Sequence, residues 1–449
     1  MRFDQIAEFA LDERAVPEAA IDMGALLLID TLGVAAGAAS LEVARIARAH
    51  AVRFHGAARA EDAATLLFDG RRASLSGACF AAATQIDNLD AHDGYNPTKG
   101  HIGCAVVPAL CALAEHLPGL SGRAGLAALV MSYELSARAA ITLHNTVSDY
   151  HTSGAWNALG VAAMVARLRG HDAETLRHAL GIAEYHGPRS QMMREIANPT
   201  MLHDGSGMGA LVGMMAGLLA EDGFQGAPAI TVDSAEAAPF WGDLGETWTI
   251  TQNYIKPYPI CRWAHAAIDA LGLLMRDNDL KADDVAEIEV HTFAQAAALF
   301  AQMPETTSQA QYSLPFALAV RLVRGWIGPE HIAGAGLRDA AVAEAIGRIR
   351  VTEAARHSER FPLGRWSDVT LHLRDGRVLS SGDVHARGGP EAPMQRSEIE
   401  EKFHAVTGPM APARKAALWQ MTDRLQDPQT RFADLLALIH APLEGAEHG

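Results

Sequence analysis

The chain has 449 residues, of which 49% are hydrophobic and 20% charged, as in a globular protein with two or three domains or one large domain with a smaller partner. Its formal net charge of −16 argues against binding to nucleic acid or to an anionic membrane, although a local basic cluster could still bind a small anion. The four cysteines form no C-x-x-C pair, which predicts neither a zinc ribbon nor an iron–sulfur site and fits a reducing cytoplasm.

The first 255 residues or so predict a mostly helical structure. Apolar residues recur at helical spacing over 21–38, 104–117, 124–143, 155–168 and 207–220. The N-terminus lacks the basic-then-apolar layout of a signal peptide. The longest apolar stretch, about 20–39, carries Asp22 and Asp30, so we expect a buried helix there and not a membrane span.

The character of the sequence changes after about residue 280. Residues 285–293, 349–352 and 368–384 alternate like strands, the last with a hairpin signal at Asp375-Gly376. A helical stretch lies at about 313–324, and helical periodicity returns over 396–440. We therefore predict a mainly α fold with an α+β insertion. The large helical domain is built from both chain ends, 1–265 and 393–449, and the smaller α+β domain spans 266–392.

The densest polar segment runs from residue 87 to residue 101. It contains Asp87, Asp90, His92, Asp93, Tyr95, Lys99 and His101. Its glycines and its Asn-Pro pair mark a loop between two helices, where catalytic groups often lie. His101 falls at a helix start, whose dipole disfavours the charged imidazole and leaves a competent base. A solvated loop with a capping Asp is the alternative, and we favour the catalytic interpretation.

The same segment holds residue types that bind metals. Asp90, His92, Asp93 and His101 would be the ligands. Their spacing matches no established pattern such as H-E-x-x-H, so we expect no metal and keep a metal-dependent hydrolase or hydratase as an alternative. The chain has no G-x-G-x-x-G after a strand and no Walker loop, which gives no support to a nucleotide cofactor.

Two further polar segments follow. In the first, His151 lies beside Tyr150 at another helix N-terminus, where it could instead be an exposed residue next to a cap. The second, 253–265, contains Lys256, which could neutralise a substrate carboxylate, and Cys261, which could open a helix and have a lowered pKa. A domain junction with Cys261 as a small core residue explains the second segment equally well.

These three segments, in this order and spacing, resemble the MmgE/PrpD family, which includes 2-methylcitrate dehydratase, cis-aconitate decarboxylase and iminodisuccinate epimerase. The other segments that carry the resemblance are Leu28-Ile-Asp-Thr-Leu-Gly, Tyr133-Glu-Leu-x-x-Arg138, Leu202-His-Asp-Gly-Ser-Gly-Met-Gly, Lys256-Pro-Tyr-Pro-x-Cys-Arg-x-x-His265 and Tyr312-Ser-Leu-Pro-Phe-Ala. The resemblance implies that the α+β domain is a lid, that the site lies in the cleft between the domains, and that the protein is a homodimer without metal or organic cofactor.

The residues and the resemblance together predict roles for individual residues. The catalytic set would be Asp90, Asp93, His101, His151, Lys256 and Cys261, and the substrate-binding set His92, Lys99, Tyr150, Tyr258, Arg262 and Tyr312. One of the two histidines, His101 or His151, would be the base and the other the acid, and Asp90 would orient its histidine.

This sequence departs from the family pattern at several of these positions. The departures are His92 for an Asp, Gly94 for a Thr, Gly100-His-Ile-Gly for His-Pro-Ser, Cys261 for the decarboxylase His, Pro199-Thr-Met201 at a decarboxylase Lys, and Phe316 for a lid Tyr. The departures weaken assignment to the decarboxylase or to 2-methylcitrate dehydratase. They leave intact the first step that these enzymes would share, the removal of a proton next to a carboxylate.

We therefore expect a cytoplasmic, cofactor-independent, dehydratase-like lyase that removes a proton next to a carboxylate of a small di- or tricarboxylic acid. An epimerase, isomerase or decarboxylase using the same residues is the alternative. A further alternative is a protein that binds carboxylates without catalysing a reaction. We expect no nucleic-acid or membrane partner.

Overall fold

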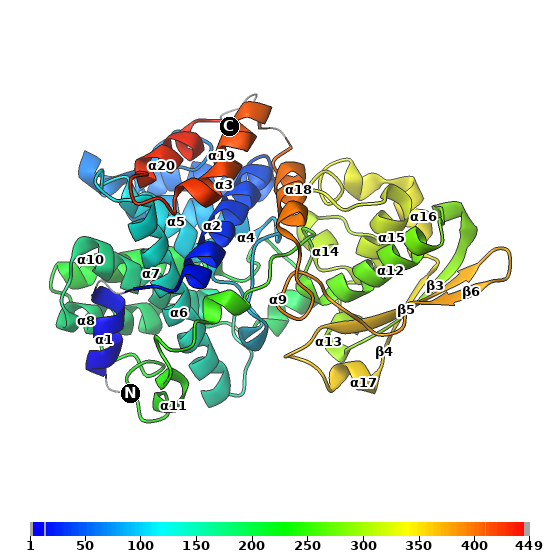
Figure 1. Ribbon diagram of the computed structural model, residues 1–449, viewed down its shortest axis with the longest axis horizontal. Coiled ribbons are helices and arrows are strands. Elements are labelled where there is room, and N and C mark those ends of the chain that lie inside the picture. The colour runs from blue at the N-terminus through cyan, green and yellow to red at the C-terminus, as the bar shows by residue number, and fades with distance from the viewer. Residues whose placement is uncertain (1–2, 13–14, 409, 444–449) are drawn as a thin grey trace.

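The computed structural model of the protein describes residues 3–12, 15–408 and 410–443. Figure 1 shows a larger helical body beside a smaller body that carries a sheet. The helices of the larger body are α1 (Phe3–Leu11), α2 (Glu18–Ala38), α3 (Glu42–Phe54), α4 (Leu75–Asp87), α5 (Gly103–Ala114), α6 (Gly122–Thr146), α7 (Gly154–Arg169), α8 (Ala173–His186), α9 (Met193–Ala197), α10 (Ser206–Glu221), α11 (Ala238–Trp241), α18 (Arg396–Val406), α19 (Pro412–Arg424) and α20 (Phe432–His440). Two short strands, β1 (Ala63–Thr65) and β2 (Arg72–Ser74), pair antiparallel in the same body.

The smaller body contains the remaining helices and strands. These are α12 (His265–Asp277), β3 (Val285–Thr292), α13 (Ala294–Ala297), α14 (Thr307–Gln311), α15 (Leu314–Arg324), α16 (Ala340–Ile346), β4 (Ile349–Glu353), α17 (Ala355–Ser358), β5 (Trp366–Leu373), β6 (Val378–Ser380) and β7 (Val384–His385). The 3-10 turns of the chain are η1 (Ala60–Asp62), η2 (Asn96–Thr98), η3 (Thr249–Gln252), η4 (Arg262–Ala264), η5 (Ala282–Asp284) and η6 (Gly336–Arg338).

Small side chains let the core helices of the larger body pack closely. On α10, glycines recur every four residues on the side that faces α7. A Cβ at Gly213 would collide with the Ala158 carbonyl, and one at Gly217 with the Val165 side chain. Such a strip of glycines allows two helix backbones to approach closely. The high Ala and Gly content therefore produces a tightly packed helical core.

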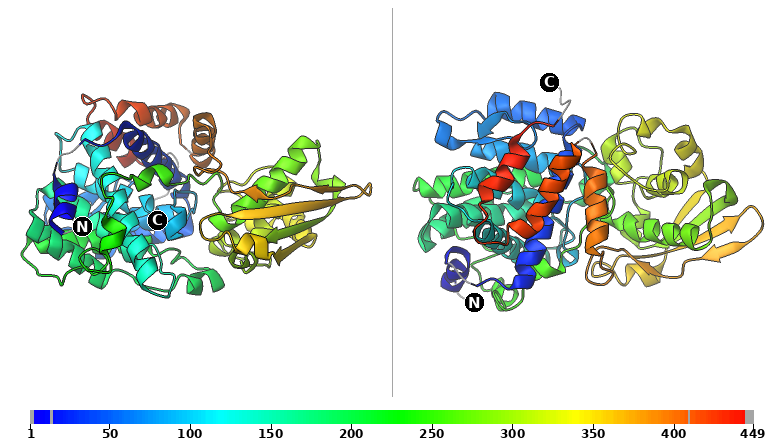
Figure 2. Two further views of the ribbon diagram at one scale, coloured as in Figure 1. Left: turned by 60° about the horizontal axis from the view of Figure 1, so that its bottom comes forward. Right: turned by 45° about the horizontal axis from the view of Figure 1, so that its top comes forward.

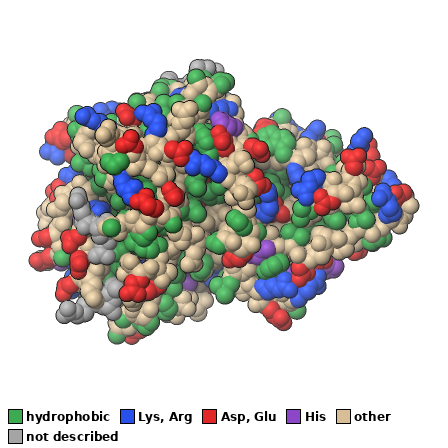
Figure 3. Space-filling model, in the orientation of Figure 1, with side chains coloured by type: hydrophobic (Ala, Val, Ile, Leu, Met, Phe, Trp, Pro, Cys, Tyr) green, Lys and Arg blue, Asp and Glu red, His purple; other side chains and the backbone are tan. Residues whose placement is uncertain are grey.

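Helices α2 and α6 are the two described helices that are long and apolar enough to cross a membrane. Their most apolar 18-residue windows are 78% and 89% buried inside the protein. The prediction of a buried helix at about 20–39 is therefore confirmed. The face shown in Figure 3 carries acidic and basic side chains interspersed with apolar ones.

The sheet of the smaller body has the order β4-β3-β5-β6, and β7 also pairs with β5. Strand β3 runs parallel to β4 and antiparallel to β5. Ile288 and Val290 on β3 and Val369 and Leu371 on β5 are buried, while their neighbours along each strand are less so, as expected of a sheet with one covered face. Helix α12 packs against β5 and α15.

The C-terminal helices return to the larger body. Helices α18 and α19 both pack on α2, and Figures 1 and 2 show them beside the N-terminal helices. The predicted fold class is thus confirmed: the protein is mainly α, its helical body contains both ends of the chain, and an α+β part lies between them.

Candidate active site

The loop after α4 holds an uncommon backbone conformation. Of the five described non-glycine residues with positive φ, Asp90, Lys99 and His203 lie in or beside the polar segments singled out above. Such conformations persist only where the surrounding structure enforces them, and they occur often at functional sites. This clustering is a structural reason to look for the site here.

Asp90 and Lys256 form a buried ion pair. The Lys256 ammonium donates to the Asp90 carboxylate and also to the Asp90 carbonyl at 3.1 Å, and the two residues are 0% and 3% exposed. A backbone bridge brings them together, because Gly94 and Tyr254 exchange hydrogen bonds of 3.0 and 2.8 Å. Burial opposes the charged ammonium, but the Asp90 carboxylate outweighs it and holds the pKa of Lys256 above its usual value.

The same bridge explains one departure from the family pattern. A Cβ at Gly94 would collide with the hydroxyl of Tyr254. The phenol therefore fills the space that a threonine side chain at this position would need. Tyr254 is itself buried, so the replacement leaves a hydroxyl close to the Asp90–Lys256 pair.

His101 is held in one tautomer. Its Nδ1 lies 2.6 Å from the Asp93 carbonyl, which can only accept, so Nδ1 donates and Nε2 keeps its lone pair. Nε2 lies 3.4 Å from a carboxylate oxygen of Asp204, and the backbone N–H of His101 donates to Ser153 Oγ at 2.9 Å. Burial, aided by Lys256, lowers the pKa of His101 well below its usual value. At neutral pH the ring is therefore an uncharged base.

This arrangement corrects one prediction. Asp90 was expected to orient its histidine, but its carboxylate binds Lys256 instead. The carbonyl of Asp93 fixes the ring of His101, and Asp204 faces its other nitrogen. The Asp93 carboxyl is buried beside Tyr133 and Gly103, and burial raises its pKa to about 7.

Asp204 and His203 were not assigned roles from the sequence, although their segment was part of the resemblance. Asp204 accepts from the Ser153 N–H at 3.1 Å, and burial raises its pKa to about 6. The ring of His203 lies 5.4 Å from that of Tyr312, and burial lowers the pKa of His203 to about 3. The available signal was the Leu-His-Asp-Gly-Ser sequence just before α10, which places both side chains at a helix start.

His92 is fully buried beside His101. The centroids of the two rings are 4.5 Å apart, and His92 Nε2 lies 3.8 Å from Asp87. Neither ring nitrogen of His92 has a hydrogen-bond partner among the described residues. Burial, together with the nearby His101 and Lys256, lowers its pKa well below the usual value, so the ring is neutral.

The residue types at this place could hold a metal. Asp90, His92 and His101 offer ligand atoms that lie within 4.8 Å of one another. The Lys256 ammonium, however, already binds Asp90 and would repel a divalent cation there. A protein cation, Lys256, thus already occupies the place beside Asp90, an arrangement that favours acid–base chemistry on an anion.

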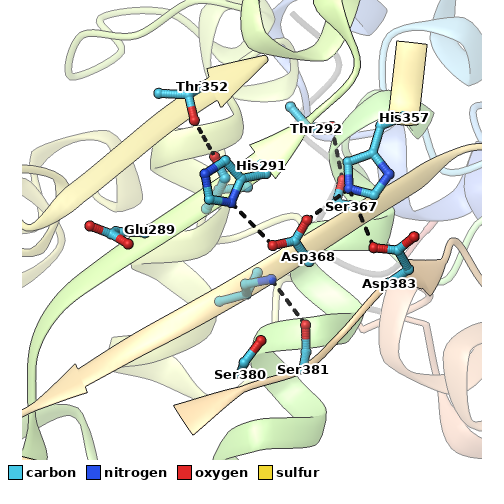
Figure 4. A network of polar contacts seen from close by, with 12 residues as sticks. Glu289, His291, Thr292, Thr352, His357, Ser367, Asp368, Ser380, Ser381 and Asp383 are labelled. Atoms are coloured by element: carbon cyan, nitrogen blue, oxygen red, sulfur yellow. Dashed lines mark hydrogen bonds and ion pairs between the residues drawn. The ribbon is translucent and has the colours of Figure 1, made fainter. Parts of the chain in front are cut away.

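A second cluster of histidine and carboxylate groups lies on the sheet of the smaller body (Figure 4). His357 and His291 contact the Asp368 carboxylate at 2.8 and 3.1 Å. Asp368 also binds Arg356, and Asp383 binds Arg360 at 2.8 Å. Because two guanidinium groups already balance the two carboxylates, this cluster is a structural ion-pair network that joins α17 to the sheet.

The structure places the other predicted site residues as follows. Tyr150 donates to the Lys99 carbonyl, and the Lys99 ammonium lies 4.9 Å from the centre of the Tyr150 ring. The backbone N–H of His151 donates to a ring nitrogen of His144 at 3.3 Å, and His151 forms a bridge with Gln191. His151 thus lies on the neighbouring loop, and it is Ser153, two residues further on, that reaches His101.

The side chains of Tyr258 and Arg262 bind protein groups. The Tyr258 hydroxyl donates to Asp269 at 2.9 Å, and Arg262 donates to the carbonyls of Ala386, at 2.9 Å, and Arg387. Both side chains therefore join the Lys256 segment to the smaller body. Substrate binding by either would require these bonds to break.

Cys261 and Tyr312 complete the predicted set. The expected lowering of the Cys261 pKa is wrong, because burial raises it to about 12 and keeps the thiol protonated. Tyr312 is buried, and burial together with Asp90 and Asp204 raises its pKa well above the usual value. Both residues thus carry protons at neutral pH.

A cleft of about 1130 Å³ lies between the two bodies and ends near this cluster. Its lining includes Asn88 and Met201 from the larger body and Ser308 from the smaller one. The Asn88 carbonyl accepts a hydrogen bond of 2.8 Å from the Gln311 side chain, and this bond joins the two bodies. Asp90, His101 and Lys256 are all buried, and none of the three lines this cleft.

Two family models match the chain and together cover nearly all of it. The MmgE/PrpD N-terminal domain matches residues 4–237, and the MmgE/PrpD C-terminal domain matches residues 258–427. No curated protein matches the chain. The first match contains the His101 loop and Asp204, and the second begins two residues after Lys256. The chain therefore belongs to the MmgE/PrpD family.

Proposed function

We propose that this protein is a dehydratase-like lyase that needs no metal or organic cofactor. It would remove a proton next to a carboxylate of a small hydroxy di- or tricarboxylic acid. Membership of the MmgE/PrpD family supports an enzyme that acts on such acids. The observation that carries the proposal is the neutral His101, whose unprotonated Nε2 faces Asp204 in a buried site where the charge of Lys256 also acts on the ring.

The first step is a proton transfer. His101 Nε2 takes the proton from the carbon next to the substrate carboxylate, and Asp204, 3.4 Å away, stabilises the imidazolium that forms. The Lys256 ammonium has three N–H donors and uses two of them on Asp90. Its remaining N–H can bind the carboxylate as negative charge grows on it, and a buried site strengthens that interaction.

The second step is loss of water. The imidazolium of His101 gives its proton to the departing hydroxyl, the C–O bond breaks, and the electron pair of the broken C–H bond forms the C=C bond. The protonated hydroxyl of Tyr312 is available as a hydrogen-bond donor to the substrate. One base thus performs both transfers, and the enzyme returns to its starting state when water leaves.

The test uses malate, citrate and 2-methylcitrate in D₂O with EDTA present. We expect alkene absorbance to rise with at least one of them, and deuterium to appear next to a carboxylate in recovered substrate. Exchange without alkene formation would replace the lyase with the epimerase, and release of CO₂ would replace it with the decarboxylase. Complete loss of activity in EDTA that zinc or magnesium restores would contradict the metal-free chemistry.

The mechanism predicts a pH dependence that Asp204 sets. Its carboxylate must be ionised to stabilise the imidazolium, and burial raises its pKa to about 6. We therefore expect kcat/KM to rise as the pH increases through about 6 and then to level off. In D204N this rise should disappear and the plateau should be lower. A D204N profile with an unchanged acidic limb would show that another group titrates.

A further inference from the structure

Arg365 is a buried cation without a carboxylate partner. It directly precedes β5 in the smaller body and is 1% exposed. Its Nη2 donates weakly to the Asn96 carbonyl at 3.4 Å, while Nε and Nη1 have no hydrogen-bond partner among the described residues. A guanidinium taken out of water without a partner is costly, so a group of this kind calls for an explanation.

Other buried arginines of the protein have a carboxylate partner or two carbonyl partners, and in three of them only Nε is left without a hydrogen bond among the described residues. Arg48 pairs with Asp69 at 3.1 Å, Arg138 pairs with Asp243, and Arg262 donates to two carbonyls. Arg365 differs from them because two of its three nitrogens have no hydrogen-bond partner among the described residues and the third has one bond of 3.4 Å. Apart from its weak bond to Asn96, the Arg365 guanidinium lies over the face of the Phe361 ring, and its central carbon is 4.9 Å from the ring centre.

A second cation lies close to Arg365. Lys99 is half-buried, and its pKa is lowered by burial and by the charge of Arg365. The Asn96 side chain donates to the Leu363 carbonyl at 3.4 Å, so the loops that carry the two cations touch each other. Lys99 comes from the same loop as His101, whereas Arg365 comes from the smaller body. Two like charges in one buried place favour an anion between them.

The place is also close to the acid–base residues. The charge of Arg365 contributes to the lowered pKa of His101 and acts on Cys261 and Tyr254 as well. Lys256 forms an ion pair with Asp90, whereas Arg365 forms no ion pair with a carboxylate of the described residues. The site therefore has a second cation, contributed by the smaller body, that no described carboxylate pairs with directly.

We propose that Arg365, with Lys99, binds a second carboxylate of the substrate, the one that does not take part in the reaction. The inference rests on the proposed function and assigns the residues that would select its di- and tricarboxylic acids: one carboxylate meets Lys256 while the other meets Arg365. Because the guanidinium belongs to the smaller body and the base to the larger one, such a substrate joins the two bodies and positions its proton at His101.

The test compares ligands that differ by one charge. Succinate and glutarate are paired with their monoamides, succinamate and glutaramate, and their dissociation constants are measured by calorimetry. We expect the wild-type protein to prefer the dicarboxylates by about tenfold or more, since a desolvated Arg–carboxylate bond is strong. R365M should abolish the preference and R365K should keep part of it. The control R360Q removes the nearby Arg360–Asp383 pair and should keep the preference fully.

Thermal unfolding separates a binding role from a structural one. Methionine fills a similar volume and removes the unpaired charge, so ligand-free R365M should melt a few degrees above the wild type and gain less stability from succinate than the wild type does. A lower melting temperature together with an unchanged dicarboxylate preference would overturn the proposal.

If the wild-type protein exchanges no proton in any acid but its preference still depends on Arg365, the subsite stands and the lyase does not. If exchange occurs and R365M keeps the preference, the lyase stands and the subsite does not.

Discussion

Replacing His101 with alanine is expected to lower kcat/KM by about 10³-fold, within the range that a positioned general base contributes. The ring is the neutral base of the proposed mechanism, with Nδ1 donating to the Asp93 carbonyl and Nε2 free. The change is measured as the rate of alkene formation, and as α-proton exchange in D₂O, on whichever acid proves to be a substrate.

His151 provides the matched control. It was predicted as the partner acid, but its backbone bonds to His144 and Gln191, and among the described residues no hydrogen bond joins its ring to His101, Asp204 or Lys256. We therefore expect H151A to lower kcat/KM by less than about tenfold, well below the effect of a general base. Equal losses in the two variants would restore His151 to the mechanism. An H101A variant that keeps more than about a tenth of the activity would rule out His101 as the base.

The fold class could be predicted because its main signals are local. Helices such as α2 and α6 have long apolar runs, and a strand such as β5 alternates and ends at the Asp375-Gly376 turn. The short strands β1 and β2 were missed because three residues are too few to show alternation. The return of α18 to the first helices was inferred from the change in periodicity, and its packing on α2 agrees.

The site was predicted only in part, for a physical reason. Asp90, Lys256 and His101 lie in polar segments that stand out along the chain, and the structure brings them together. The ion pair between Asp90 and Lys256 joins residues 166 positions apart, and no periodicity predicts such a contact. Arg365 was missed because it lies alone in a loop, where only its burial without a partner distinguishes it.

Tyr258 and Arg262 illustrate the converse case. Their residue types suit a carboxylate site, and the sequence does not show that Asp269 and two backbone carbonyls already bind them. Polar residues near a catalytic motif thus divide into those that the fold has satisfied and those that it has left unsatisfied. This distinction depends on tertiary contacts, and it is the one that selects Arg365 as a substrate-binding residue.

Replacing Lys402 with methionine is expected to destabilise the protein by about 3–5 kcal/mol, the cost of leaving a buried charge unpaired. Lys402 on α18 donates to both carboxylate oxygens of Asp30 at 2.6 Å, and the residues are 7% and 1% exposed. The pair joins the C-terminal part of the helical body to α2. Urea unfolding measures the change, with R396M as the control. Arg396 lies on the same helix in an exposed pair with Asp423, and its loss should cost less than about 1 kcal/mol.

The double variant D30L/K402M separates stability from activity. Replacing both charges with apolar groups removes the unpaired carboxylate, so most of the lost stability should return. The Lys402 ammonium, however, also donates to the Ala91 carbonyl at 2.7 Å, between Asp90 and His92 in the chain. Without that donor the carbonyl is buried and unpaired, and the loop that presents Asp90 to Lys256 loses its support.

We expect the double variant to fold stably with a reduced kcat. If kcat recovers together with stability, Lys402 only holds α18 in place. If it does not, the C-terminal helix positions the active-site loop, which is a physical reason for both chain ends to meet in one domain.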